Sequence, residues 1–410
     1  MKKIGYIVSV FPSTSATFVL NEIIMLKKNN FNIKVISLKR PNNEVIQSGV
    51  EDFLDNIIYV PNVKDGLKEI IKLIIYNLKY LIKNPIKYFK NLNVALKTKS
   101  KNVIYDFYRA VYLSQHLNID DIDHIHSQFA HSPTNIAYFL NVLTNKKYSF
   151  TCHAVDIFVE KNRVLIEKQL ENASFAITIS RYNIEYIKNI IFNKKLVNKF
   201  EIVRCGIDYN NLKKIEDGNI KSKNNVKIFS VGRFVEKKGF DFLIESLKNI
   251  DRKKIDFECI IVGDGPLYNG INEKIINYGL EDKIILLGAV NSKVVKENLV
   301  NSDIFILPCV IAENGDMDGI PVSLMEAMSY EVPTISTKVS GIPELITSHK
   351  NGILVEPKDI KGLEEAIEFL IKNPEKRIEY GKNARKKIID EFGLEENTNK
   401  LVQKFKQLIK

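Results

Sequence analysis

Short runs of apolar, largely β-branched residues alternate along this chain with stretches in which apolar residues recur every three or four positions. Continuous apolar runs are typical of parallel strands covered on both faces, and the wider spacing is typical of amphipathic helices. The pattern therefore predicts an α/β chain built from two doubly wound Rossmann-like sheets. We expect strands at 3–10, 31–38, 124–127, 148–153, 175–180, 200–206, 226–233, 256–265, 283–290, 303–309, 332–337 and 352–357.

The two strand-rich halves are joined by a polar stretch, residues 207–225, which is rich in Asn and Lys. Such stretches separate folded domains, and 410 residues suit two of them. We expect a first Rossmann-like domain over 1–206 and a second over 207–389. The last helical pattern, 390–410, is expected to pack back on the first domain.

Residues 64–105 depart from the alternation, because they form a lysine-rich amphipathic helical pair broken near Pro85. Basic amphipathic helices bind anionic membrane surfaces, which would make the protein a peripheral membrane protein. The alternative is a helical hairpin packed on its own domain with its lysines in solvent. The sequence leaves both interpretations open.

The composition is that of an ordinary globular protein, with 45% hydrophobic and 27% charged residues, which excludes disordered and collagen-like chains. The net charge of +11 suits phosphates or anionic lipids. Nucleic acid is not an expected partner, because no basic stripe with stacking aromatics occurs. The N-terminus is more typical of a buried strand than of a signal peptide, so we expect a soluble, cytoplasmic protein. The four cysteines have no metal-binding or redox spacing.

The stretch 316–343 carries the strongest chemical signal. Asp318 and Gly319 follow a strand, and Pro321 suits the first turn of a helix predicted over 322–329. Backbone N–H groups at the start of such a helix, at the carboxyl end of a parallel sheet, form a phosphate site. Glu326 lies on this helix among apolar neighbours without a cation three or four positions away. A ribose diol would satisfy its carboxylate; the alternative is that Glu326 reaches solvent or a lysine of another element.

A second candidate segment, 226–243, delivers Gly232 and Arg233 to a loop that carries Lys237 and Lys238. Arg233 and Lys238, two fixed cations near a helix N-terminus, suit a diphosphate leaving group, whose charge grows in the transition state. Alone, this segment would be an ordinary surface loop. The turn that follows, IVGDGP at 261–266, does not complete a dinucleotide fingerprint.

In the first half, His153 follows a predicted strand and is a candidate for contact with a sugar hydroxyl or a developing positive charge. The alternative is a loop histidine satisfied by its own domain. No metal site is expected from His124, His126 and His131, because no third ligand follows at a fixed spacing. The opening segment 11–23, which ends near Glu22, either faces a cleft or caps a helix.

Together these residues resemble the family-4 retaining glycosyltransferases of the GT-B fold, in particular members of polysaccharide assembly. The pattern is an acid, seven residues and a Glu: Asp318, then GIPVSLM, then Glu326. VGRFVEKKGFDFLI, IVGDGP, RCGID and HAVD extend it. The resemblance implies two Rossmann-like domains facing across a cleft. It also implies metal-independent transfer, without a cofactor, from a UDP- or GDP-linked sugar to a surface-polysaccharide or lipid-linked glycan acceptor.

The resemblance also implies roles for single residues. Glu326 would bind the donor ribose and Asp318 the transferred sugar, whereas Arg233 and Lys238 would hold the diphosphate. His153 would face the reacting carbon. Further donor contacts would come from the backbone of Gly319, Ile320, Pro321, Val322 and Val290.

Two features depart from the family. Asp318 stands where Glu is usual, which shortens the reach toward the sugar. The first loop lacks the glycine pair common in the family, and Ala16 stands where similar polysaccharide-assembly members often have an acid. Two other hypotheses remain open. One is a metal-dependent transferase that uses Asp316 and Asp318 as ligands. The other is a non-catalytic nucleotide-sugar-binding subunit that activates a partner.

Overall fold

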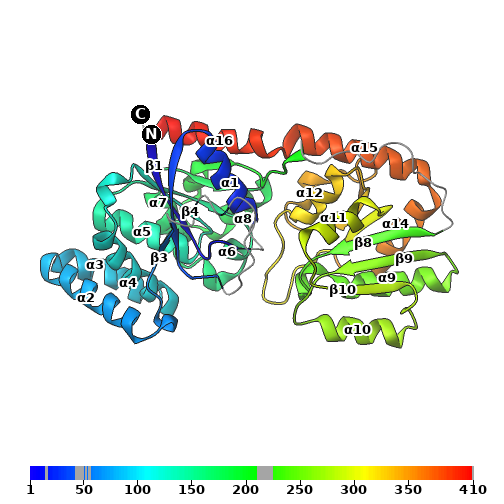
Figure 1. Ribbon diagram of the computed structural model, residues 1–410, viewed down its shortest axis with the longest axis horizontal. Coiled ribbons are helices and arrows are strands. Elements are labelled where there is room, and N and C mark those ends of the chain that lie inside the picture. Colours follow the sequence, from blue (N-terminus) through cyan, green and yellow to red (C-terminus); the bar gives the residue numbers. More distant parts are fainter. Residues whose placement is uncertain (14–16, 42–49, 51–52, 54–56, 210–224, 409–410) are drawn as a thin grey trace. The chain divides into compact units, whose positions relative to one another are not determined.

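The computed structural model describes residues 1–13, 17–41, 50, 53, 57–209 and 225–408 (Figure 1). The chain divides into two compact units. The first unit comprises Met1–Arg204 and Thr398–Lys410, and the second comprises Cys205–Asn397. The polar stretch expected at 207–225 lies almost wholly outside the described residues.

The first unit is built on a seven-stranded sheet in the order β3-β2-β1-β4-β5-β6-β7, with every pair parallel. The chain runs outward from β1 to β3 and then returns to the other side of β1, so the switch in direction lies between β1 and β4. The strands are β1 (Lys2–Val8), β2 (Phe31–Ser37), β3 (Ile58–Tyr59), β4 (His124–Gln128), β5 (Tyr148–Cys152), β6 (Ala176–Thr178) and β7 (Phe200–Ile202).

Helices cover both faces of this sheet (Figure 1). They are α1 (Thr17–Lys28), α2 (Leu67–Lys83), α3 (Pro85–Lys97), α4 (Lys101–His116), α5 (Ser132–Thr144), α6 (Val155–Phe158), α7 (Ile166–Asn172) and α8 (Arg181–Ile190). The C-terminal helix α16 (Leu394–Leu408) adds Leu401, Val402 and Phe405 to the buried core against β1 and β2. The Phe405 ring contacts Phe31 with centroids 5.8 Å apart.

The second unit is built on a six-stranded parallel sheet in the order β10-β9-β8-β11-β12-β13. Its strands are β8 (Val226–Val231), β9 (Phe257–Val262), β10 (Ile284–Gly288), β11 (Ile304–Leu307), β12 (Thr334–Thr337) and β13 (Ile353–Val355). Its helices are α9 (Phe240–Arg252), α10 (Tyr268–Asn277), α11 (Ser292–Val300), α12 (Val322–Ser329), α13 (Ile342–Leu345), α14 (Ile360–Lys372) and α15 (Pro374–Glu391). Here the switch in direction lies between β8 and β11.

The predicted α/β architecture with two parallel sheets is confirmed, and each of the twelve expected strands is present. Strand β3 was not expected, and it has only two residues. His124 and His126 lie inside β4, where both rings bond to the hydroxyl of Ser149 at 2.8 Å. Burial lowers the pKa of both imidazoles, so they are neutral core residues.

Candidate functional site

The candidate site of the second unit lies at the carboxyl ends of β8 and β11, on either side of the switch in strand order. Ligands of open α/β sheets bind at this place, because the loops on the two sides diverge there. The loop after β8 carries Arg233, Lys237 and Lys238, and the loop after β11 carries Asp316 and Asp318.

Close backbone contacts hold these two loops together. Gly239 has φ +70°, and a Cβ at this position would lie 1.9 Å from the carbonyl oxygen of Pro308, so only glycine fits. The N–H of Val310 donates to the carbonyl of Lys237 at 2.9 Å. The carboxylate of Glu236 accepts from the N–H of Glu313 at 3.1 Å. The loop after β8 is thereby fixed against the end of β11.

The contact between the two loops places two lysines next to two aspartates. Lys238 Nζ lies 2.6 Å from Asp318 Oδ2, and Lys237 Nζ lies 3.4 Å from Asp318 Oδ1 and 3.1 Å from Asp316 Oδ2. Burial opposes ionisation of Asp318, but the two ammonium groups outweigh it and hold the pKa of Asp318 below its usual range. Burial likewise disfavours the charged form of Lys238, yet Asp318 keeps the pKa of Lys238 above its usual range. The four groups form a mutually neutralising cluster.

The structure thus brings Lys238 and Asp318 into direct contact, and it adds Lys237, to which the sequence analysis gave no role. Arg233 differs from both lysines, since its side chain is exposed. Among the described residues, no carboxylate forms an ion pair with its guanidinium. Arg233 is therefore a cation that an incoming anion can pair with.

Helix α12 begins and ends at the predicted residues, Val322 and Ser329. The extended backbone of Pro321, with φ −61° and ψ 128°, starts the helix, and no side chain caps it. The N–H of Gly341 donates to the carbonyl of Gly319 at 3.2 Å and so fixes the approach to the helix. Backbone N–H groups in the first turn of such a helix are available to an anion.

Glu326 lies mid-helix and is partly buried, between the buried side chains of Met325 and Ala327. Within the described chain its carboxylate has neither a hydrogen bond nor an ion pair, and burial alone raises its pKa to about 7. A carboxylate held out of water without a partner destabilises the protein unless a ligand supplies donors. Perturbed groups of this kind concentrate at functional sites.

Val290 lies beyond the carboxyl end of β10, the edge strand, which is separated from β8 by β9. It is at the same end of the sheet as the lysine–aspartate cluster, and no described contact joins it to that cluster.

His153 belongs to the first unit, where it follows β5 and is buried. Its Nε2 bonds to Oε1 of Gln128 at 2.7 Å, and its ring lies 4.8 Å from the rings of both Phe18 and Phe129. Its backbone N–H donates to the carboxylate of Asp156 at 3.1 Å. Burial lowers the pKa of His153 to about 4, so the imidazole is neutral at pH 7.

Sequence reasoning missed the group that orients this histidine. The amide nitrogen of Gln128 donates to the hydroxyl of Tyr6 and to Oε1 of Glu22, the latter at 3.1 Å, which leaves its amide oxygen for His153. Tyr6 also donates to Glu22. Burial outweighs these hydrogen bonds and raises the pKa of Glu22 to about 7. The only signal in the sequence was Glu22 itself, because Tyr6 and Gln128 resemble ordinary strand residues.

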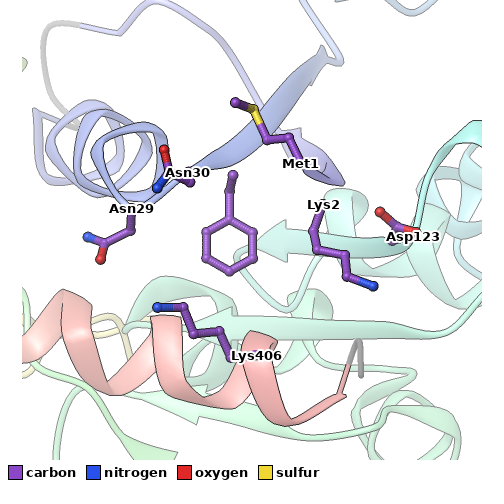
Figure 2. A pocket seen from close by; sticks show the side chains of 7 residues that line it. Met1, Lys2, Asn29, Asn30, Asp123 and Lys406 are labelled. Carbon is purple, nitrogen blue, oxygen red and sulfur yellow. The ribbon is translucent and has the colours of Figure 1, made fainter.

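The hollows among the described parts of the first unit include the following two. The larger, about 790 Å³, lies where β1 and β2 begin and is lined by residues that include Lys2, Asp123 and Lys406 (Figure 2). It is at the end of the sheet opposite to His153, where open α/β sheets do not bind their ligands. The smaller, about 300 Å³, is lined by residues that include Ser100, His131 and Asn162. It lies one aromatic layer from His153, because the His131 ring stacks on Phe129.

Several known proteins that are similar to this chain are named glycosyltransferases. Residues 212–387 match the family of glycosyl transferases group 1. The putative colanic acid biosynthesis glycosyltransferase WcaL of Escherichia coli is 38% identical over 168 residues, 41% of each chain. The matched residues fall within the second unit. The amylovoran biosynthesis glycosyltransferase AmsK of Erwinia amylovora is 28% identical over 381 residues, 88% of each chain.

Solved glycosyltransferase structures share the fold of the two units. A glycosyltransferase from Rickettsia africae has a TM-score of 0.71 at 18% identity, covering 100% of this chain and 99% of that one. Anabaena HepE in complex with UDP has a TM-score of 0.75 at 16% identity, covering 99% and 100%. These likenesses show the two-domain GT-B fold. The aligned segment spans about two fifths of the length of the WcaL proteins from Escherichia coli and Salmonella typhimurium.

Proposed function

We propose that this protein is a retaining glycosyltransferase that moves a sugar from a nucleotide-diphosphate sugar to a surface-polysaccharide or lipid-linked glycan acceptor. The observation that carries the proposal is Glu326, a partly buried carboxylate without a partner in the described chain, on a helix of the second unit. The two hydroxyls of a ribose would supply the donors that this carboxylate lacks. The names of WcaL and AmsK support a role in polysaccharide assembly.

The diphosphate would lie between Arg233 and the N-terminus of α12. An exposed guanidinium and uncapped helix N–H groups stabilise phosphate oxygens, most strongly as the leaving group gains charge. Lys238, which is paired with Asp318, would help to hold the diphosphate. Asp318 would contact the transferred sugar. The leaving phosphate would assist attack by the acceptor on the same face of the sugar. The anomeric configuration of the sugar would then be retained. Neutral His153 would contact the sugar by hydrogen bonding rather than as an acid.

The lysine–aspartate cluster supports a reaction without metal. Both carboxylates that a divalent cation would need, Asp316 and Asp318, already bind ammonium groups at 2.6–3.4 Å. A metal would have to displace Lys237 and Lys238, whose charges the two aspartates balance. Transfer unchanged in excess EDTA is the expected result, and loss of transfer that Mg²⁺ or Mn²⁺ restores would favour the metal-dependent alternative.

The acceptor would bind in the first unit, and its natural form would be a glycan on a lipid at the cytoplasmic face of the membrane. The 300 Å³ hollow next to His131 has a polar lining suited to sugar hydroxyls. AmsK, which aligns with most of this chain, is named for amylovoran biosynthesis.

A panel of UDP-, GDP-, ADP- and CMP-sugars tests the proposal by thermal shift, followed by assays of donor hydrolysis and transfer. One nucleotide class should raise the melting temperature of the protein, Glu326→Gln should abolish that shift, and Arg233→Ala should reduce it. Glu273→Gln, at an exposed glutamate of α10, is the matched control. Binding without hydrolysis or transfer to any acceptor would instead indicate a non-catalytic subunit.

A further inference from the structure

Helices α2 and α3 form an outer layer of the first unit and present their apolar side chains to solvent. They pack on α4, which packs on α5 (Figure 1). Of the nineteen large apolar side chains that are exposed in the described chain, nine lie on these two helices. Soluble proteins rarely expose such a concentration, and where they do it marks an interaction site.

The exposed residues of α2 form a single stripe. They recur at intervals of three or four residues, so they share one face of the helix. They are Leu67 (71% exposed), Ile71 (47%), Ile74 (52%), Ile75 (44%), Leu78 (53%) and Ile82 (80%). Beyond the break at Pro85, α3 continues the surface with Ile86 (85%), Phe89 (57%) and Leu96 (50%).

The buried face of α2 is the opposite one and is partly polar. Asn77 is buried there and donates to the carbonyls of Leu73 at 2.8 Å and Tyr108 at 3.1 Å, while Tyr88 of α3 donates to Asn77 at 3.3 Å. An ordinary surface helix turns its apolar stripe inward and its polar residues outward. Here the outward face is the apolar one, so the core of the first unit does not account for the stripe.

Lysines accompany the stripe. Residues 64–101 contain ten lysines and two acidic residues, so this segment carries +8 of the chain's net +11. Lys68, Lys79, Lys83 and Lys90 are exposed. A surface that joins apolar side chains to a high positive charge is complementary to a bilayer with anionic headgroups.

We infer that α2 and α3 dock on the surface of an anionic lipid bilayer, with the stripe inserted among the acyl chains and the lysines at the headgroups. A second copy of this chain is a poorer occupant, because two segments of charge +8 would repel each other. No helix in the described chain is long and apolar enough to cross a membrane, so docking would be peripheral.

Docking on a bilayer would help the proposed transferase to reach a lipid-linked acceptor. This benefit rests on the proposed function, whereas docking itself does not. Helix α3 ends at Lys97, three residues before Ser100, which lines the 300 Å³ hollow. A bilayer seated on α2 and α3 would therefore bring a lipid-linked glycan close to that hollow.

Vesicle flotation of the full chain tests the inference, with phosphatidylcholine–phosphatidylglycerol (7:3) against phosphatidylcholine alone. The protein should float with the anionic vesicles and stay in solution with the neutral ones. Ile74→Ser/Leu78→Ser/Ile82→Ser should lower the partition coefficient at least about a hundredfold. The control for it is Phe192→Ser/Ile276→Ser/Ile285→Ser, at exposed apolar positions elsewhere, which should float like the wild type.

Lys79→Gln/Lys83→Gln/Lys90→Gln should lower binding by about fivefold for each lysine, and 0.5 M NaCl should have a similar effect. The matched control is Lys293→Gln/Lys361→Gln/Lys386→Gln. All variants should keep the wild-type melting temperature and its shift by the nucleotide sugar, so loss of docking is distinguishable from failure of the proposed function.

Three results would overturn the inference. One is a wild type that stays in solution with anionic vesicles, and another is equal binding to neutral vesicles. The third is a wild-type dimer in light scattering that the Ile74/Leu78/Ile82 variant converts to a monomer, which would make a second copy the occupant.

Discussion

Replacement of Glu326 by glutamine should stabilise the protein in a pH-dependent way while it abolishes donor binding. Glutamine keeps the shape of the side chain but cannot ionise. Since burial raises the pKa of Glu326 from 4.5 to about 7, the folded protein holds this proton more tightly than the unfolded chain. Protonated Glu326 therefore adds to the free energy of unfolding. This contribution is fully present below pH 4.5 and is lost as the pH rises through about 7.

The size of the effect follows from the same two pKa values. The free energy of unfolding of the wild type should fall, relative to that of Glu326→Gln, by roughly 2–3 kcal/mol between pH 5 and pH 8. For a domain of 150–250 residues this corresponds to a gap in melting temperature that widens by roughly 5–10 °C.

Thermal denaturation of both proteins at pH 5, 6, 7 and 8, with and without the nucleotide sugar, measures both effects. Glu273→Gln is the control and should follow the wild type at every pH. Without ligand, the gap in melting temperature between Glu326→Gln and the wild type should widen from pH 5 through pH 7 and level off toward pH 8. With ligand, only the wild type should gain stability. Parallel curves, or an equal gain for both proteins, would refute the assignment of Glu326 as an unpartnered donor-binding carboxylate.

The remaining predictions concern the cations and His153. Arg233→Ala should weaken nucleotide binding about tenfold or more in calorimetry without changing the melting temperature, because the side chain is exposed. Lys238→Ala should abolish transfer. It should also lower the free energy of unfolding by about 2–3 kcal/mol, because Asp318 keeps only the more distant Lys237. The second substitution Asp318→Asn should restore the free energy of unfolding but not the transfer activity. The lowered pKa of His153, about 4, predicts that stability falls as the pH drops from 6.5 toward 4 and that His153→Gln reduces this loss in acid denaturation.

Local patterns determined much of what the sequence predicted correctly. Pro321 and the apolar positions after it define α12 to the residue, and the isolation of Glu326 could be predicted from its neighbours three and four positions away. The parallel sheets followed from continuous apolar runs, because strands buried on both faces need them.

What the sequence did not predict depends on contacts between distant segments. Lys237 meets Asp316 and Asp318 only because Gly239 packs on the carbonyl of Pro308, about seventy residues away. Periodicity likewise predicted an amphipathic α2 but not which face would point outward, since the spacing of a stripe is the same in both cases. Its orientation is set by hydrogen bonds of Asn77 to its own helix and to α4.

A crystal structure with the nucleotide diphosphate selected by thermal shift would show whether Glu326 binds the donor ribose. We expect both ribose hydroxyls within hydrogen-bond distance of the Glu326 carboxylate, with the diphosphate on Arg233 and the first turn of α12. A nucleotide bound elsewhere, or one whose ribose leaves Glu326 without a partner, would contradict this expectation.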